Sequence, residues 1–268
     1  MRIPFVKMHG LGNDFIVLDG REGGLPALTE TIATRLADRN CGIGCDQLVL
    51  LEPSSRADFA MRIFNADGGE VEACGNAARA VAILHGAAAR VETKGGVIAL
   101  SPSDRGASVE MGEPAFAWDA IPIEYPMDTG QMPVSWETLH NPAAVNVGNP
   151  HVVFFVDDVD GVPLDRLGPV IERDPLFPQR INVNVAAVAE THIDLRVWER
   201  GTGLTRACGT GACATAVAAI GRGLAQSPVT VRLPGGELTI AWVPGQPIVM
   251  SGPASESFRG TFDWDDYA

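Results

Sequence analysis

The chain has 268 residues, of which 46% are hydrophobic and 20% charged, enough for one large domain or two of ordinary size around packed cores. Its formal net charge of −13 argues against binding to nucleic acid or to an anionic membrane surface, because both require a basic face. No stretch has the long apolar run of a signal peptide or a membrane span, so the five cysteines are expected to be free thiols in a cytoplasmic protein.

The first half of the chain shows a regular succession of predicted elements. A Gly-Asn turn leads into an apolar strand over 10–19, and a helix is expected near 29–39. Over 61–80 a strand is followed by a glycine-rich loop that carries Cys74 and then by a helix of small residues. Residues 90–100 are typical of two strands joined through Gly-Gly.

The second half repeats this succession. The proline-rich stretch 113–136 is expected to form the crossing between the halves. A second Gly-Asn turn and apolar strand occupy 146–158, and a helix is predicted over 165–173. A strand, a glycine-rich loop and a small-residue helix follow over 195–214, and the stretch 229–242 again predicts a Gly-Gly hairpin.

The two halves align without a gap around their cysteines. Residues 61–80 match 195–214 at a constant offset, and Ala-Cys-Gly recurs at Cys74 and Cys208. Such a repeat predicts two similar structural units. We therefore expect an α+β fold of two related domains with a cleft between them.

The expected domains are a first half over 1–115 that carries Cys74 and a second half over 116–255 that carries Cys208. Whether the last strand, 256–268, returns to the first half is left open by the sequence. If the related halves face one another, their cysteines lie on opposite sides of the cleft.

Each cysteine is predicted to stand at the N-terminus of a helix. There the helix dipole should lower the thiol pKa, and the amides that follow, without helical acceptors, can bind an anion. Two such sites on one carboxylate would place a thiol on each face of the adjacent carbon, which suits inversion of a stereocentre. Taken alone, either cysteine is more simply a small buried hydrophobic residue.

Two other patterns in the sequence suggest alternative kinds of binding site. The stretch 209–214 matches Gly-x-Gly-x-x-Ala but lacks the preceding strand and the following acidic residue of a dinucleotide site. Cys41 and Cys45 have a spacing that could suggest a metal pair, yet no partner cluster accompanies them. Together with Cys213 they are expected to be packing residues.

Five motifs together resemble those of the diaminopimelate epimerase family. They are MHGLGNDF, FNADGGEVEACGNAARA, GNPHVVFFVDD, INVNV and WERGTGLTRACGTGACA. The resemblance covers nearly the whole chain. It implies two pseudo-symmetric domains, each a sheet wrapped around a central helix, with the active site in the cleft between them. It also implies interconversion of LL- and meso-diaminopimelate by two cysteines, without cofactor or metal, for the synthesis of lysine and peptidoglycan.

The resemblance assigns roles residue by residue. Cys74 and Cys208 fall on the catalytic thiols, and His151 and Glu199 fall on residues that modulate their pKa. The α-carboxylate contacts fall on the first residues of the two helices: Gly75, Asn76, Gly209 and Thr210. The other substrate contacts fall on polar side chains spread over both halves: Asn13, Gln47, Asn65, Asn149, Asn182, Glu199 and Arg200.

The planar guanidinium of Arg200 suits the distal carboxylate, helped by Asn65 and Asn182. The implied partner is a small amino-acid substrate. A homodimer is also implied, although Phe258 stands where relatives often have tyrosine at a dimer contact.

Three other functions remain to be distinguished. A proline or hydroxyproline racemase of the same fold would lack the residues that recognise the distal end of the substrate, such as Arg200. A non-catalytic amino-acid-binding protein would need the helix amides but not both cysteines. A nucleotide-binding oxidoreductase would purify with an absorbing cofactor.

Overall fold

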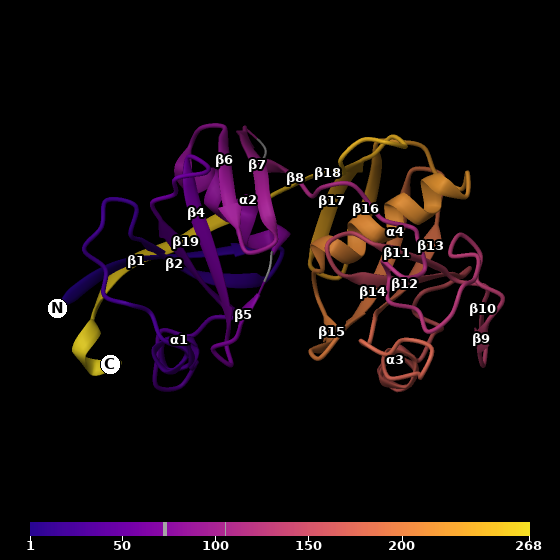
Figure 1. Ribbon diagram of the computed structural model, residues 1–268, viewed down its shortest axis with the longest axis horizontal. Helices are drawn as coiled ribbons and strands as arrows, with labels where there is room; N and C mark the ends of the chain where they lie inside the picture. The colour runs from indigo at the N-terminus through magenta and orange to yellow at the C-terminus, as the bar shows by residue number, and fades with distance from the viewer. Residues whose placement is uncertain (72–73, 105) are drawn as a thin grey trace. The chain divides into compact units, whose positions relative to one another are not determined.

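The computed structural model describes residues 1–71, 74–104 and 106–268. Glu72 and Ala73, which belong to the expected loop before Cys74, lie outside the described residues, as does Arg105. The chain divides into two compact units: one comprises Met1–Val109 with Gly252–Ala268, and the other comprises Glu110–Ser251 (Figure 1).

In the first unit the strands pair in the order β19, β1, β2, β3, β4, β6, β7 and β8, and the short β5 pairs with β4. The strands are β1 (Arg2–Gly10), β2 (Asn13–Asp19), β3 (Gln47–Glu52), β4 (Phe59–Asn65), β5 (Glu70–Val71), β6 (Ala89–Thr93), β7 (Gly96–Ser103), β8 (Gly106–Glu110) and β19 (Ser255–Asp263). The helices are α1 (Glu30–Ala37), α2 (Gly75–His85) and the 3-10 helix η1 (Trp264–Asp266).

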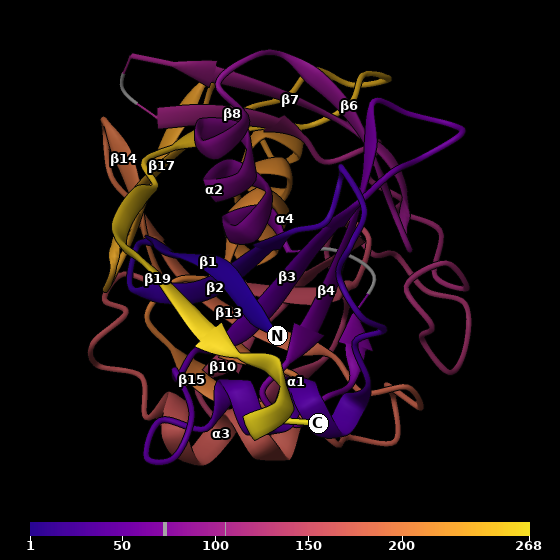
Figure 2. The ribbon, with the colours of Figure 1, turned by 90° about the vertical axis from the view of Figure 1, so that its left-hand side faces the viewer.

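The sheet of the first unit curls around α2. This helix contacts β1 and β7, which stand far apart in the strand order, and Figure 2 shows it between those two parts of the sheet. Ala77, Ala78 and Ala80 are fully or almost fully buried, and such small side chains let strands approach the helix closely from several sides. The amphipathic α1 instead buries Ile32 and Leu36 in a second cluster outside the curl.

The second unit is built in the same way around α4. Its main strands pair in the order β11, β12, β13, β14, β16, β17 and β18. The strands are β9 (Ser135–Trp136), β10 (Leu139–His140), β11 (Ala143–Asn146), β12 (Pro150–Phe155), β13 (Asn182–Val188), β14 (His192–Glu199), β15 (Gly203–Thr205), β16 (Val229–Leu233), β17 (Gly236–Ala241) and β18 (Val249–Gly252). The helices are α3 (Leu164–Glu172) and α4 (Gly209–Gly221), and α4 contacts β11, β12, β13 and β17.

Matching crossovers relate the two units. In the first, parallel strands β2 and β3 are joined through α1, and parallel strands β4 and β6 through α2. In the second, parallel strands β12 and β13 are joined through α3, and parallel strands β14 and β16 through α4. The prediction of an α+β fold with two pseudo-symmetric domains, each a sheet around a central helix, is confirmed.

The proline-rich stretch 113–136 differs from expectation. It is part of the second unit, where Ile121, Ile123 and Met132 are 1%, 3% and 0% exposed in the hydrophobic core. Burial of these side chains outweighs the linker character that the prolines suggest. The two compact units meet at 109/110 and 251/252, and the sequence-based division lies at 115/116 and 255/256.

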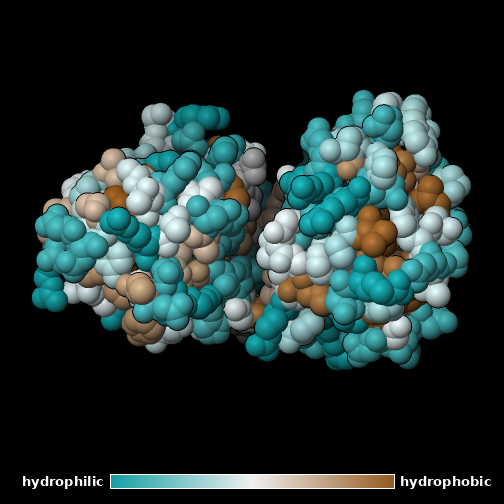
Figure 3. All heavy atoms as spheres, turned by 90° about the horizontal axis from the view of Figure 1, so that it is seen from below, coloured by the Kyte–Doolittle hydropathy of each residue, from teal (hydrophilic) through white to brown (hydrophobic). Residues whose placement is uncertain are grey.

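Figure 3 shows a face on which hydrophilic residues predominate and hydrophobic residues form small, separate patches. Among the described residues, none of the helices has the length and apolar character needed to cross a membrane.

Candidate active site

Strand register brings three predicted binding residues to one edge of the first unit. Asn13 begins β2, Gln47 begins the parallel β3, and Asn65 ends the antiparallel β4 directly opposite Gln47. The Gln47 side-chain amide donates to Asn65 Oδ1 over 2.9 Å. Gln47 Oε1 is one of the few buried side-chain polar atoms in the described residues that have no hydrogen-bond partner. This edge therefore presents an unused acceptor.

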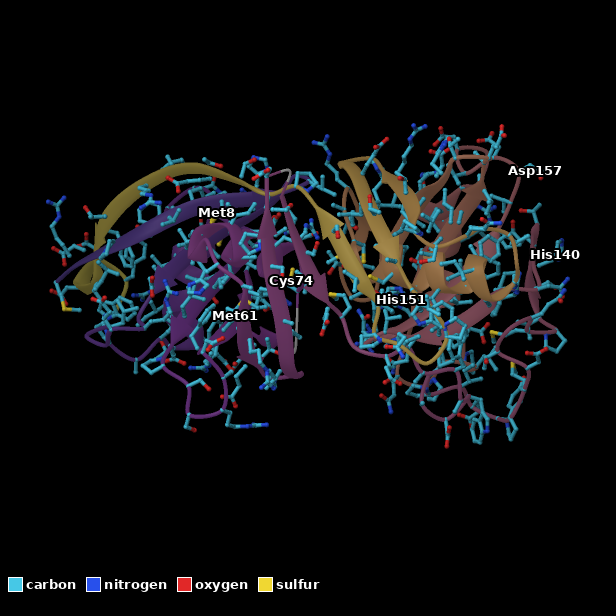
Figure 4. The ribbon with its side chains drawn as sticks, turned by 90° about the horizontal axis from the view of Figure 1, so that it is seen from above. Met8, Met61, Cys74, His140, His151 and Asp157 are labelled. Carbon is cyan, nitrogen blue, oxygen red and sulfur yellow. The ribbon has the colours of Figure 1, made fainter. Side chains whose placement is uncertain are left out.

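Cys74 is the N-cap residue of α2, as the sequence predicts, and its side chain is partly buried (Figure 4). Its thiol lies 3.8 Å from Asn13 Oδ1, to which it can donate. Asn76 in the first turn of α2 donates to the same oxygen over 3.2 Å. As the first two residues of the helix, Gly75 and Asn76 carry backbone N–H groups without intrahelical acceptors. The thiol and these donors together form the first half site.

Cys208 is the N-cap residue of α4 and occupies the equivalent place in the second unit. Its sulfur accepts a hydrogen bond from the Gly211 amide over 3.3 Å and lies 3.5 Å from the Thr210 hydroxyl. Gly209 and Thr210 are the first two residues of this helix, so their amides likewise lack intrahelical acceptors. The second half site thus repeats the chemistry of the first.

The electrostatics of Cys208 differ from the expectation that the helix dipole lowers its pKa. Burial, followed by the negative charge of Glu199, raises the pKa of the Cys208 thiol well above its usual range. These two effects outweigh the hydrogen bonds from Thr210 and Gly211, which act in the opposite direction. The thiol proton therefore needs a nearby acceptor before the sulfur can act as a base.

Glu199, at the end of β14, supplies that acceptor. It shares a hydrogen bond with Cys208 and accepts another from the Thr205 hydroxyl over 2.5 Å. Burial raises the pKa of Glu199, and both hydrogen bonds partly offset the rise. The carboxyl group and the thiol consequently titrate as a coupled pair that shares one proton more readily than it carries two negative charges.

His151 is fully buried on β12 (Figure 4), and burial lowers its pKa to about 3. Asn184 donates from its side-chain nitrogen to Nδ1 over 3.1 Å, so Nε2 carries the proton and donates to Asn149 Oδ1 over 2.8 Å. The imidazole is thus neutral at physiological pH. The ring therefore brings no charge to bear on a thiol pKa, and the role of His151 as a pKa-modulating residue stays a prediction.

The segment that carries Arg200 is held by Asn182. The Asn182 amide donates to the carbonyl of Pro150 over 2.8 Å, and its Oδ1 accepts the backbone N–H of Arg200 over 2.9 Å. The Arg200 guanidinium is exposed, apart from a hydrogen bond to the carbonyl of Gln179. Asn182 thus fixes the backbone of Arg200, while the guanidinium of Arg200 stays exposed.

Several residues around the half sites were not singled out from the sequence. They contact the predicted residues and are Asp46, Arg79, Asn184 and Thr205. Asn184 and Thr205 have no counterpart in the repeat, so only the fold reveals them. Of the cysteines expected to be packing residues, Cys45 and Cys213 are buried, but Cys41 is exposed. Among the described residues, no group of three or more His, Cys, Asp or Glu side chains is arranged to hold a metal ion.

Comparison with known proteins identifies the family. The model of the family described as "Diaminopimelate epimerase" matches residues 5–117 and 143–256. The chain belongs to the diaminopimelate epimerase family. A member of this family from Erythrobacter litoralis is 66% identical over 269 residues, which cover 100% of both chains.

Solved structures that resemble the chain extend beyond this family. A phenazine biosynthesis protein of the PhzF family from Enterococcus faecalis has a TM-score of 0.73 at 15% identity, over 98% of this chain and 100% of that one. A hydroxyproline epimerase from Agrobacterium vitis, solved with bound trans-4-hydroxy-L-proline, has a TM-score of 0.66 at 17% identity, over 97% and 92% of the chains. At such low identity these two likenesses concern the fold alone.

Proposed function

We propose that the protein interconverts LL- and meso-diaminopimelate by proton transfer between two cysteines, Cys74 and Cys208. The observation that carries this proposal is the repetition of one arrangement in two units: each central helix begins with an N-cap cysteine followed by backbone N–H donors. Membership of the diaminopimelate epimerase family, with 66% identity to the Erythrobacter litoralis relative, supports the choice of substrate.

In the proposed reaction, each thiol serves one face of the reacting α-carbon. One cysteine, as thiolate, removes the α-hydrogen, and the electron pair left on carbon is delocalised into the adjacent carboxylate. The other cysteine, as thiol, donates its proton to the opposite face, so the centre is inverted and the thiolate and thiol exchange places. The backbone donors at Gly75, Asn76, Gly209 and Thr210 stabilise the charge on the carboxylate.

Glu199 allows Cys208 to act as either the acid or the base in this reaction. With one proton shared between the two side chains, the pair exists as thiol with carboxylate or as thiolate with carboxylic acid. The first form donates a proton to carbon, and the second accepts one. His151, neutral and bonded to Asn149 and Asn184, contributes no charge that would fix Cys208 in one of these forms.

The remaining polar residues would recognise the far end of the substrate. We assign Arg200 to the distal carboxylate, with Asn65 and Asn182 beside it, because a guanidinium can bind a carboxylate through two hydrogen bonds. The unused acceptor Gln47 Oε1 suits an ammonium group, and Asn13 and Asn149 complete the set. These residues favour diaminopimelate over proline, which has no second amino-acid end.

We also propose a compartment, an oligomeric state and a biosynthetic role for the enzyme. Working without cofactor or metal, it would act in the cytoplasm, as a homodimer, and contribute to lysine and peptidoglycan synthesis. Retention of both cysteines distinguishes it from a binding protein, which would need only the backbone donors.

Incubation of the purified protein with LL-diaminopimelate, followed by chiral analysis of the product, tests the proposal. We expect the meso isomer to form and L-proline in a parallel reaction to remain unchanged. Conversion of proline but not of diaminopimelate would favour a racemase of the same fold. Binding of diaminopimelate without conversion would favour a binding protein.

A further inference from the structure

Two side-chain amides of the first half site lie between a cation and a carboxylate. Arg79 donates from Nη2 to Asn76 Oδ1 over 2.8 Å, and Asn76 donates from Nδ2 to Asn13 Oδ1 over 3.2 Å. Asn13 in turn donates from Nδ2 to Asp46 Oδ2 over 3.1 Å. The four side chains form one chain of hydrogen bonds that runs from Arg79 to Asp46.

The two ends of this chain determine its direction. A guanidinium has donors only, so Asn76 must turn its oxygen to Arg79 and its nitrogen to Asn13. An ionised carboxylate has acceptors only, so Asn13 must turn its nitrogen to Asp46 and its oxygen back toward Asn76. The orientation of each amide therefore follows from the chemistry of its neighbours.

The fixed orientation of Asn13 determines what the catalytic sulfur meets. Asn13 Oδ1 is the atom that lies 3.8 Å from Cys74 Sγ. With the opposite orientation, an N–H donor would face the sulfur and would favour the thiolate over the thiol. In the structure, the side-chain carbonyl oxygen of Asn13 accepts the S–H hydrogen of Cys74. This bond favours the protonated thiol and fixes the direction of its S–H bond.

Both ends are anchored in the fold. Arg79 is fully buried in α2 and also donates to the carbonyls of Gly75 and Pro253. Asp46 Oδ2 accepts the backbone N–H of Asp14 over 3.1 Å, and the backbone N–H of Asp46 donates to Asp14 Oδ1 over 3.1 Å. Neither end can turn away without loss of these bonds.

We propose that Asp46 and Arg79 are positioning residues that orient Asn13 and Asn76, and thereby the Cys74 thiol, for proton transfer. This inference rests on the proposed epimerase function and adds two residues to its site. Arg79 donates directly to Asn76 and Asp46 accepts directly from Asn13, so each acts through the amide beside it.

A double-mutant cycle tests the proposal at the Asp46 end. Because a charge-assisted hydrogen bond to Asn13 is lost, we expect Asp46→Ala to lower kcat/KM for LL-diaminopimelate about tenfold. In an Asn13→Ala background, Asp46→Ala should have no further effect, because the amide through which it acts is gone. Damage to the loop as a whole would instead lower kcat/KM by the same factor in both backgrounds and would overturn the proposal.

Arg39→Ala is the matched control. It removes a cation paired with both Asp14 and Asp46 but leaves the bond from Asn13 to Asp46 in place, so kcat/KM should stay within about twofold. A loss in Arg39→Ala equal to that in Asp46→Ala would show that the ion pairs matter and not the amide orientation. Melting temperatures are measured for all variants.

If Asp46→Ala does not fold, Asp46→Asn, which keeps the shape of the side chain, is used in the same cycle. A smaller loss of kcat/KM that disappears in the Asn13→Ala background supports the proposal, and one that persists there overturns it. Wild-type protein is assayed beside every variant. Absence of epimerisation in the wild type would contradict the proposed function, whereas an active wild type with a failed cycle contradicts only the role of Asp46.

Discussion

The Thr205 hydroxyl donates a hydrogen bond to the Glu199 carboxylate over 2.5 Å. The two residues come from neighbouring antiparallel strands, β14 and β15, that precede the helix of Cys208. Burial raises the pKa of Glu199, and this hydrogen bond is the largest effect in the opposite direction. Thr205 therefore favours the ionised form of Glu199 next to the Cys208 thiol.

Thr205→Val removes the hydroxyl at nearly constant volume. Because the pKa of Glu199 then rises further, the acid limb of the pH profile of kcat/KM should move to higher pH, and activity below neutral pH should fall roughly tenfold. Thr202→Val, at an exposed position in the turn between β14 and β15, is the control and should leave the profile unchanged. A Thr205→Val profile that coincides with the wild-type profile would contradict this role.

Removal of either of the two thiols proposed as catalytic should stop the reaction. We expect Cys74→Ala and Cys208→Ala each to lower kcat by roughly 1,000-fold or more, because the remaining thiol serves only one face of the carbon. Cys41→Ala, at an exposed cysteine, should retain wild-type kcat. Kinetics with LL-diaminopimelate and circular dichroism of all three variants provide the measurement. Substantial activity in one of the two catalytic variants would rule out the two-thiol scheme.

Gly211 in the first turn of α4 is required by the packing of the second half site. A Cβ atom at this position would lie 2.8 Å from Asn184 Oδ1, 3.0 Å from Val197 Cγ2 and 3.2 Å from Cys208 Sγ. Gly211→Ala should therefore lower kcat at least tenfold and destabilise the protein by about 1–3 kcal/mol, since an overpacked core must shift.

Gly221, at the other end of the same helix, is the matched control. A Cβ atom there meets nothing within 4 Å, so Gly221→Ala should be neutral or stabilising by up to about 1 kcal/mol because alanine has the higher helix propensity. Thermal unfolding and kcat of both variants are compared. Equal changes in stability and kcat for the two variants would show that helix propensity, and not contact with Asn184 and Cys208, determines the effect of Gly211→Ala.

The sequence was sufficient for the overall architecture because the repeat places strand, cysteine, helix and hairpin in the same order in both halves. The helices predicted over 29–39 and 165–173 are α1 and α3, since their apolar residues recur at helical spacing. The position of Cys74 and Cys208 before their helices follows from the same repeat.

Properties that depend on tertiary contacts could not be predicted in this way. The pKa of Cys208 rises because the folded chain buries the thiol and places Glu199 beside it, and neither effect can be read from Ala-Cys-Gly. Thr205 and Asn184 act through bonds to Glu199 and His151, residues on neighbouring strands. Buried Ile121 and Met132 likewise bring a proline-rich stretch into the core.

The ionisation of Asp14 makes the stability of the folded protein depend on pH in the acid range. Hydrogen bonds and charge from Arg39 and Lys7 lower its pKa far below the ordinary value, despite the opposing effect of burial. Since the folded-state pKa is below the unfolded one, the stabilisation is complete above the unfolded pKa of about 4 and is lost as pH falls further.

Asp14→Asn should lower the free energy of unfolding at pH 7 by about 2–3 kcal/mol, because Lys7 then stays buried without its carboxylate. The difference from wild type should shrink below pH 4. Urea unfolding at several pH values measures it. A difference that stays constant with pH would contradict the ion-pair explanation.

Hydrogen isotopes distinguish a mechanism with two separate bases from a mechanism with a single base. A thiol carries a single hydrogen, so the cysteine that removes the α-hydrogen cannot supply the hydrogen of the opposite face. When the reaction with LL-diaminopimelate is run in deuterium oxide and stopped early, the product should therefore carry deuterium at the inverted centre. Recovered substrate should be almost free of label, because reversal returns the original hydrogen from the same sulfur before it exchanges. Mass spectrometry of the separated isomers gives both values. Deuterium that enters substrate and product at equal early rates would exclude Cys74 and Cys208 as bases that each serve one face.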